Sequence, residues 1–428
     1  MKIQNYGQLA VSDGRKALLS IAEAGLQAID TAAVMREMLR LDGSTLAIDG
    51  TRFDLNDIGK LVFIAIGKCA TDAGGVAEEI LGDRISGGVV VDVKKCPASA
   101  RLKTFCGTHP LPSEENMRAA EAIMESLKGL TERDLVLFVV SGGGSTLLFL
   151  PEDKANRQEE KIFTALTAAG ATIQEMNIVR KHLSLARGGY LAKAAYPARA
   201  VSLIFSDVPA NDISFIASGP TVKDITTIED AAKVLAKFGV EQVCDVEHCG
   251  LIETPKEDRY FERVTNILAV SNVRALEAMK TAAEKLGFRA EIRGSELAGD
   301  ASETGQMVAE TLHAAAPHSV LFWGGETTVM VRGTGEGGRN LELSASALRF
   351  VRDGEEILSL ASDGHDHGPY AGAICDTMTK KAADEAGANP EEFRSRNDTY
   401  GLFGKIGNYV MTGDTGSNVS DLVIALKL

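Results

Sequence analysis

Two hydrophobic patterns alternate along the first half of the chain. Short continuous apolar runs predict buried strands, and they occur at residues 61–66, 88–93, 135–140 and 200–205. Apolar residues at helical spacing predict helices from Asp13 onward, after residue 67, and over 117–127 and 161–185. Buried strands that alternate with helices are typical of a parallel, doubly wound sheet, whose ligands lie beyond the carboxyl ends of the strands. The pattern therefore predicts a Rossmann-like α/β domain.

The pattern changes after residue 238, where residues 239–263 become charged and irregular. This shift predicts two domains, 1–238 and 239–428, and a chain of 428 residues is long enough for two cores. The second domain is predicted to be α/β, with helices at 273–286, 301–315 and 341–351 and strands at 267–270, 290–292, 320–323, 327–331, 357–361 and 422–426. Consecutive strands around Gly324-Gly325 predict a hairpin, and hence a mixed sheet.

The charge balance is acidic, with 45 basic and 59 acidic residues and a net charge of −14. Such a balance argues against a nucleic-acid partner, and it means that local cations or a metal must hold any anionic ligand. The six cysteines show no zinc-binding spacing, so reduced thiols are expected. No apolar run is long enough for a bilayer, which predicts a cytoplasmic protein with no membrane partner. Composition leaves the number of chains in an assembly open, a homo-oligomer included.

A glycine loop follows the apolar run at 135–140 and reads Ser141-Gly142-Gly143-Gly144-Ser145. Backbone N–H groups in such a loop can bind phosphate, and a helix that begins near Ser145 would add a favourable dipole. The alternative is a tight strand-to-helix turn. Lys68 follows another predicted strand and Gly67, which places its ammonium at the edge where ligands bind. The alternative is that Lys68 is an ordinary surface lysine.

Two further segments carry candidate binding groups. Arg180 and Lys181 share one face of a predicted helix with Asn177 and Ser184, and this face either binds an acidic substrate or is solvated. Asp207 follows the run at 200–205, where a carboxylate can hold magnesium, accept a hydroxyl proton or cap a turn.

The second domain repeats the strand-then-glycine design. Gly324-Gly325-Glu326 ends one predicted strand, and the glycine-rich segment 333–338 leads to Arg339. A glycine-rich backbone beside a fixed guanidinium suits a polyphosphate, while a flexible loop is the alternative. His365 and His367 stand between carboxylates, but without a third distant ligand a polar loop explains them better than a metal site.

Several of these segments occur together and in order: Gly67-Lys68, Gly107-Thr108-His109-Pro110, 141–145, 179–184, 206–208, 217–221, 324–326 and 337–340. In this arrangement the chain resembles class II glycerate kinases. The later segment, which includes Thr412-Gly413 and residues 416–419, looks like their MOFRL region.

The resemblance implies ATP-dependent phosphorylation of D-glycerate at the 2-hydroxyl, with Mg²⁺ or another divalent cation. It implies catalytic roles for Lys68, Asp207 and Arg339, with Asp207 also a candidate metal ligand. Phosphate or nucleotide binding is expected of residues 141–145 and 324–326, and substrate binding of Arg180 and Lys181. The expected partners are thus a small hydroxy acid and ATP.

Three alternatives stay open. One is a kinase of a related small sugar acid. A hydroxypyruvate reductase would need a nicotinamide site, yet the chain has no G-x-G-x-x-G between a strand and a helix. A non-catalytic sensor could carry the same glycine loops, and it would bind ligand without releasing ADP.

Overall fold

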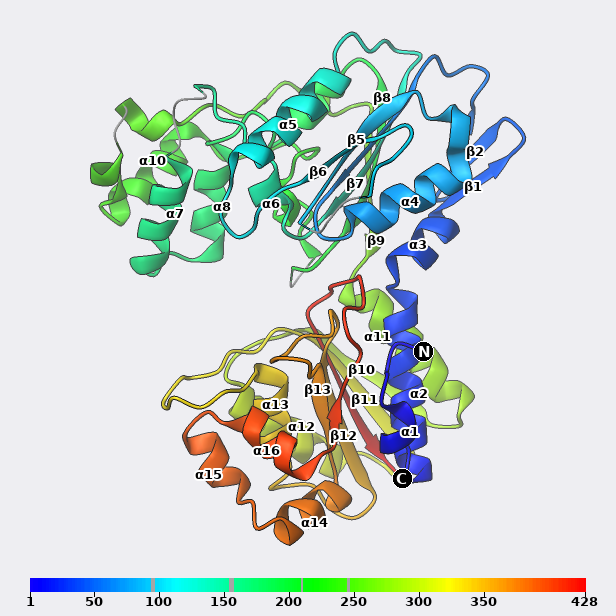
Figure 1. The fold of residues 1–428 in the computed structure, drawn as a ribbon, viewed down its shortest axis with the longest axis vertical. Coiled ribbons are helices and arrows are strands. Elements are labelled where there is room, and N and C mark those ends of the chain that lie inside the picture. Colours follow the sequence, from blue (N-terminus) through cyan, green and yellow to red (C-terminus); the bar gives the residue numbers. More distant parts are fainter. Residues whose placement is uncertain (94–96, 154–157, 209–210, 245–246) are drawn as a thin grey trace. The chain divides into compact units, whose positions relative to one another are not determined.

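The computed structural model of the protein describes residues 1–428 apart from 94–96, 154–157, 209–210 and 245–246. The chain forms two compact units (Figure 1). We call residues 34–206 and 211–269 the N-terminal unit. Residues 1–33, 207–210 and 270–428 form the C-terminal unit.

A six-stranded sheet in the order β6-β5-β4-β7-β8-β9 forms the centre of the N-terminal unit. Its strands are β4 (Leu61–Ile66), β5 (Gly87–Asp92), β6 (Lys103–Cys106), β7 (Leu135–Ser141), β8 (Arg199–Phe205) and β9 (Val264–Val270). The pairs from β6 through β8 are all parallel. β4 and β7 are buried at every position, which explains why their sequences are continuously apolar.

Helices surround this sheet, and Figure 1 shows α4 and α5 alongside its strands. The helices of this part of the chain are α3 (Thr31–Met38), α4 (Ala70–Leu81), α5 (Glu114–Ser126), α6 (Gly144–Leu147), α7 (Glu159–Ala168), α8 (Ile173–Lys181), α9 (Tyr190–Ala195) and α10 (Ile228–Lys237). A small antiparallel sheet of β1 (Leu39–Asp42), β2 (Thr45–Ile48) and β3 (Thr51–Asp54) precedes β4. The predicted helix over 161–185 is two helices, α7 and α8, separated at Gly170, whose φ is +77°.

The C-terminal unit has a mixed sheet in the order β10-β11-β15-β12-β13-β14. Its strands are β10 (Arg289–Leu297), β11 (Ser319–Gly325), β12 (Glu355–Ala361), β13 (Gly372–Cys375), β14 (Tyr409–Val410) and β15 (Asp421–Lys427). The last strand, β15, lies between β11 and β12 and is antiparallel to both. Asp421, its first residue, therefore pairs with Gly325 and Ala361, the last residues of its neighbours.

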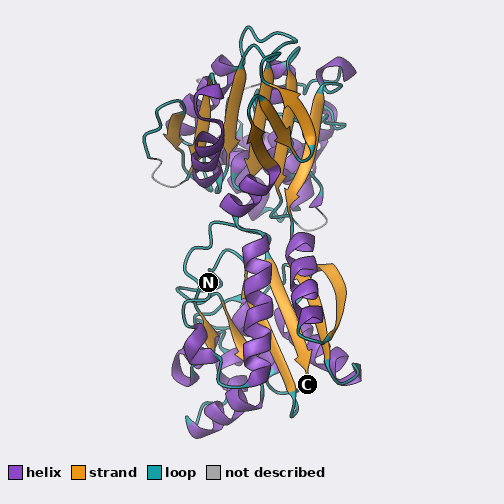
Figure 2. Ribbon diagram, turned by 90° about the vertical axis from the view of Figure 1, so that its right-hand side faces the viewer, coloured by secondary structure: helices purple, strands orange, loops and turns teal. Residues whose placement is uncertain are grey.

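Helices cover both faces of this mixed sheet. Figure 2 shows helices against its strands in the unit that carries both termini. The helices are α1 (Tyr6–Leu9), α2 (Asp13–Ala28), α11 (Asn272–Lys285), α12 (Ala301–Ala314), α13 (Arg339–Ala347), α14 (Thr377–Glu385), α15 (Pro390–Ser395) and α16 (Thr399–Ile406). α2 packs on α11, where Gly25 admits the side chain of Met279: an added Cβ would lie 2.7 Å from Met279 Cγ.

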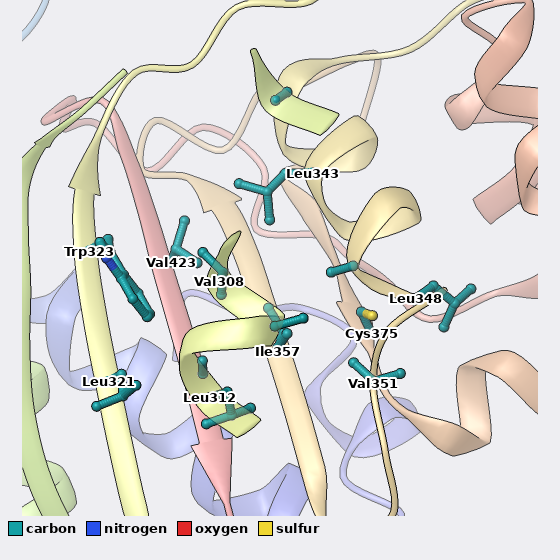
Figure 3. Close-up of a cluster of buried hydrophobic side chains, with 14 residues drawn as sticks. Val308, Leu312, Leu321, Trp323, Leu343, Leu348, Val351, Ile357, Cys375 and Val423 are labelled. Carbon is teal, nitrogen blue, oxygen red and sulfur yellow. The ribbon is translucent and has the colours of Figure 1, made fainter. Parts of the chain in front are cut away.

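One hydrophobic core lies between the mixed sheet and helices α12 and α13 (Figure 3). Alternate residues of three strands point into it, as expected where one face of a strand packs on a helix. Leu321, Trp323, Ile357 and Val423 meet Val308 and Leu312 of α12 and Leu343 of α13. This core fixes the strand ends on which the candidate site of this unit is built.

The predicted fold class, a Rossmann-like parallel sheet followed by an α/β domain with a mixed sheet, is confirmed. The compact units divide the chain elsewhere than the predicted 238/239 boundary. β9 joins the first sheet rather than the second, and residues 1–33 fold with the C-terminal unit because α2 packs on α11.

Two local predictions are wrong. The hairpin at Gly324-Gly325 does not form, because β15 pairs with β11 and leaves 327–331 outside the sheet. Cys244 and Cys249, expected to be reduced, form a disulfide, with their Cα atoms 5.2 Å apart. Cys96 lies outside the described residues.

Among the residues that the structure describes, no single helix has the length and apolar character of a membrane span. Helices α2 and α3 meet those criteria only as a pair, and that pair is bent by 54°.

Candidate active site

The glycine loop follows β7 and is joined to the end of β4. Lys68 N donates to Gly142 O (3.0 Å), and Ser141 Oγ donates to Ile66 O (3.1 Å). Gly67 and Gly143 have φ of +112° and +80°, and Gly67 lies against Ser141, where a side chain would clash. The glycines thus serve close backbone approach, as predicted. The predicted helix begins at Gly144, but α6 has only four residues.

Two side chains flank Gly143. An added Cβ there would lie 3.3 Å from Lys68 Cγ and 3.5 Å from His109 Cδ2. Burial, with the positive charges of Lys68 and Arg180, lowers the pKa of His109. We call Lys68, His109, Arg180 and residues 142–144 the N-terminal cradle.

Arg180 brings a second fixed positive charge to the cradle. Its guanidinium lies over the ring of Phe163 at 3.8 Å, and its Nε is 3.7 Å from Glu159 Oε1. That carboxylate forms a fork with Arg187, with N···O distances of 2.9 and 3.0 Å. Burial lowers the pKa of Arg180 to about 10, which leaves it charged at neutral pH. Its buried Nε has no hydrogen-bond partner among the described residues, so the cation retains donor capacity.

Lys181 has a different environment from its neighbour. Its Nζ lies 3.2 Å from Asp224 Oδ1, and both side chains are buried. Asp224 also accepts from Thr226 and Thr254, which makes a closed polar network. The predicted cationic face is therefore divided: Arg180 acts on the cradle, and Lys181 is held in a buried ion pair.

The remaining polar groups of that face also have protein partners. Ser145 Oγ lies 2.9 Å from Ser218 Oγ, which donates to Asn177 Oδ1 at 2.8 Å. Ser184 Oγ contacts the backbone of Leu148 and Leu150. These contacts tie the glycine loop to α8.

Arg339, the first residue of α13, is surrounded by carboxylates. Its Nε donates to Asp421 Oδ2 and its Nη1 to Glu326 Oε1, each at 2.6 Å. Asp421 is buried, and Asn340 Nδ2 also donates to its Oδ1 at 2.8 Å. Burial raises the pKa of Asp421 to about 6, while Arg339 opposes that shift. We call Glu326, Arg339 and Asp421 the arginine site.

The carboxylate of Asp366 caps the same helix. Its oxygens accept from the backbone N–H groups of Asn340 (3.0 Å) and Leu341 (2.9 Å), and Gly338 lies against it so closely that a side chain would clash. The first N–H groups of α13 are therefore bound by a side chain of the protein itself, and anion binding by residues 333–338 stays a prediction. Burial raises the pKa of Asp366, and the hydrogen bonds from α13 oppose that shift.

Asp207 is linked to the arginine site through one serine. Ser420 Oγ donates to Asp207 O at 3.0 Å and lies 3.4 Å from Glu326 Oε2. The structure thus brings two predicted catalytic residues, Asp207 and Arg339, into one hydrogen-bonded network of the C-terminal unit. Lys68 belongs to the N-terminal unit, and its relation to this network stays a prediction.

The histidines of the loop after β12 have local contacts. His365 Nδ1 lies 3.5 Å from Gly368 O, while the His367 ring lies 5.0 Å from that of Tyr400. Across the described parts of the chain, no three His, Cys, Asp or Glu side chains gather closely enough to hold a metal ion by themselves. The polar-loop interpretation of His365 and His367 agrees with these contacts.

The sequence patterns missed three residues of these sites. Asp421 and Asp366 carry no local signal, because their roles depend on strands and a helix that are distant in sequence. His109 stands in a quoted segment, Gly107-Thr108-His109-Pro110, but only the contact with Gly143 shows what the imidazole faces.

The chain thus combines an α/β unit whose parallel sheet carries a glycine loop beside Lys68 with an α/β unit whose mixed sheet carries an arginine among carboxylates. Two family models match: the MOFRL family over residues 319–421, and a domain of unknown function, DUF4147, over 17–249. The D-glycerate 2-kinase of Thermotoga maritima is 37% identical over 386 residues, which cover 86% of this chain and 91% of that enzyme. A protein of Agrobacterium vitis named as a hydroxypyruvate reductase is also 37% identical, over 85% of this chain and 86% of its own length.

A solved structure gives the same result. The crystal structure of a glycerate kinase from Thermotoga maritima matches with a TM-score of 0.87 and 33% identity, over 96% of this chain and 99% of that one. The chain therefore belongs to the MOFRL-containing glycerate 2-kinase family, as its resemblance predicts.

Proposed function

We propose that the protein transfers the γ-phosphoryl group of ATP to the 2-hydroxyl of D-glycerate and so forms 2-phospho-D-glycerate. The observation that carries the proposal is the N-terminal cradle, in which Lys68 and Arg180 bring positive charge to the glycine loop of an otherwise acidic protein. Cations around a flexible backbone suit a substrate with a carboxylate and a donor with phosphates. The names of two relatives, a D-glycerate 2-kinase and a glycerate kinase, support this proposal.

Each candidate residue has a role in this proposal. Lys68 and Arg180 bind the carboxylate of glycerate or a phosphate, with residues 141–145 as backbone donors. Arg339 stabilises the charge that spreads over the γ-phosphoryl group as it transfers. Gly324-Gly325 and Glu326 lie beside it at the end of β11. Lys181 stabilises the N-terminal unit through Asp224 instead of binding substrate.

Asp207 either accepts the proton of the 2-hydroxyl or helps to hold Mg²⁺. Two observations support the second role: Ser420 links the backbone of Asp207 to the carboxylate of Glu326, and carboxylate oxygens are preferred Mg²⁺ ligands. Two carboxylates are sufficient for Mg²⁺ that arrives with nucleotide phosphates. When bound, the ion would neutralise phosphate charge. A cytoplasmic location belongs to the same proposal, since ATP is the donor.

A coupled assay of ADP release tests the proposal directly. With D-glycerate and MgATP, we expect ADP release that depends on both, and phosphorus NMR should show the phosphate on the 2-oxygen. ADP release that is faster with a longer aldonate would reassign the acceptor. Ligand binding without any ADP release would instead identify a sensor.

The name of the Agrobacterium vitis relative makes hydroxypyruvate reduction the second candidate. The first βα turn of the sheet reads Gly67-Lys68-Cys69-Ala70 and lacks the three glycines of a dinucleotide-binding turn. We therefore expect no oxidation of NADH or NADPH with hydroxypyruvate, and measurable oxidation would favour the reductase.

A further inference from the structure

The imidazole of His109 occupies one side of the N-terminal cradle, beside Gly143. A Cβ added at Gly143 would lie 3.5 Å from His109 Cδ2 and 3.3 Å from Lys68 Cγ, so both side chains border the glycine loop. The His109 residue is exposed, so its imidazole is accessible to a ligand in the loop. A side chain at this place meets whatever anion the loop binds.

Among the residues that the structure describes, the charged groups that act on the pKa of His109 are Lys68 and Arg180, both positive. Lys68 acts on it from the end of β4 and Arg180 from α8, while after β7 the neutral hydroxyl of Thr146 donates to the neighbouring Pro110 O at 3.1 Å. The neighbouring segment at the start of α5 contributes the neutral amide of Asn116, whose Oδ1 accepts from Thr108 N at 2.8 Å. Partial loss of water around the imidazole disfavours its charged form, and two cations repel a third, so the pKa of His109 lies below its usual value.

An anion in the cradle reverses this balance. Its negative charge offsets Lys68 and Arg180 and gives a protonated imidazole a partner of opposite sign. Protonation then adds a charge-assisted hydrogen bond to the anion, because both ring nitrogens become donors.

We propose that His109 is a substrate-binding residue that is neutral in the free enzyme and takes up one proton when an anion fills the N-terminal cradle. The inference rests on the proposed function only for the identity of that anion, D-glycerate. Chemically, the step moves one proton from solvent to the imidazole, and no covalent bond of the ligand changes. The consequence is tighter binding of the anion as the pH falls toward the pKa of the complex.

Calorimetry can count this proton. D-glycerate and sulfate are titrated into the full-length protein at pH 7.5, in buffers with different enthalpies of ionisation. Both probes are fully ionised at that pH, so the ligand itself exchanges no proton. We expect wild type to take up a substantial fraction of one proton with either probe, and His109→Gln, which keeps an amide donor without a titrating group, to take up none.

A matched variant tests specificity. His318→Asn changes an exposed histidine of the C-terminal unit, and asparagine tolerates its φ of +56°. It should keep the wild-type proton uptake. If His109→Gln fails to fold, the wild-type measurement still decides, because the absence of uptake with both probes overturns the proposal.

The outcomes separate this inference from the proposed function. Proton uptake with sulfate, together with no binding or phosphorylation of D-glycerate, would support His109 and remove the proposed substrate. Phosphorylation of D-glycerate without proton uptake would leave the kinase intact and overturn the role of His109. Equal uptake by wild type and His109→Gln would assign the proton to another group and also overturn it.

Discussion

The two units hold their candidate residues in opposite electrostatic settings. In the N-terminal cradle, Lys68, Arg180 and His109 border a glycine loop, and the nearby Glu159 is bound to Arg187. In the arginine site, one cation, Arg339, contacts Glu326 and Asp421 and lies near Asp366. The cradle is therefore suited to bind anions directly, whereas the arginine site carries excess negative charge.

This difference suggests a division of labour. A bare phosphate would be repelled by the carboxylates around Arg339, but a phosphate that arrives with a divalent cation would not. Glu326 and Asp421 also hold the guanidinium in place before any ligand binds, which lowers the cost of organising it for transfer. On this comparison we propose that the first unit binds substrate and the second activates the phosphoryl group.

The largest expected effect is at Arg339. Arg339→Ala should lower kcat by roughly a thousand-fold or more, because charge on the transferring group loses its fixed cation. Steady-state ADP release measures this effect. Arg332→Ala, an exposed arginine of the same unit, is the matched control and should retain kcat.

A near-normal kcat in Arg339→Ala would remove this residue from the mechanism. Melting curves of both variants are needed, since the substitution also leaves the buried Asp421 without its ion pair. A loss of folding in Arg339→Ala makes Arg339→Lys the informative variant: it keeps the charge, loses the fork and should still lower kcat.

Adjacent residues of α8 give the next test. Lys181→Met leaves Asp224 buried without its ammonium, which should cost roughly 3–5 kcal/mol of unfolding free energy. Arg180→Ala should instead raise the KM for D-glycerate by about 10- to 100-fold, the value of a lost charge-assisted hydrogen bond. Denaturant unfolding and steady-state kinetics of both variants measure these effects. The reverse pattern, with Lys181 controlling KM and Arg180 only stability, would contradict the division of this helix face.

The sequence could predict the first sheet because its central strands are buried on both faces. The continuous apolar runs of β4 and β7 follow directly from that burial. The strands β1, β2 and β3 escaped prediction because each has only four residues and is partly exposed.

The candidate site was predictable only where a strand end marks it. Lys68 and Asp207 follow β4 and β8 directly, so their positions at the ligand-binding edge could be inferred. Spacing could not distinguish Arg180 from Lys181, because both choices satisfy one helical face and only tertiary contacts separate them. Asp421 could not be predicted for a related reason: it lies beside Arg339 only because β15 pairs between β11 and β12.

A smaller effect, on the pH dependence of stability, should distinguish two buried carboxylates of the C-terminal unit. Asp421 has Arg339 as its partner, whereas Glu356 Oε2 has no hydrogen-bond partner in the part of the chain that the structure describes. Burial and the charge of Asp376 raise the pKa of Glu356 to about 7, from a usual value of 4.5. Between these two pH values the folded state binds a proton that the unfolded state has lost, so stability falls as the pH rises through this window.

Glu356→Gln removes this penalty. At pH 8 its melting temperature should exceed that of wild type by an amount that corresponds to about 1–2 kcal/mol of unfolding free energy. Near pH 5 the two melting temperatures should be equal. Glu355→Gln is the control, since Glu355 has His313 at 3.1 Å and gains nothing from neutralisation. Stabilisation of Glu356→Gln at pH 5 as large as at pH 8 would show that the effect is not titration.

The most direct test of the division of labour is a set of initial rates over a grid of Mg²⁺ and D-glycerate concentrations, for Arg180→Ala and Asp207→Asn. We predict that Arg180→Ala raises the KM for D-glycerate and leaves the Mg²⁺ activation constant unchanged, and that Asp207→Asn raises the Mg²⁺ activation constant and leaves that KM unchanged. The assignment of anion and cation binding to separate units is contradicted if both variants change the same constant. It is also contradicted if Arg180→Ala changes the Mg²⁺ activation constant and Asp207→Asn changes the KM for D-glycerate.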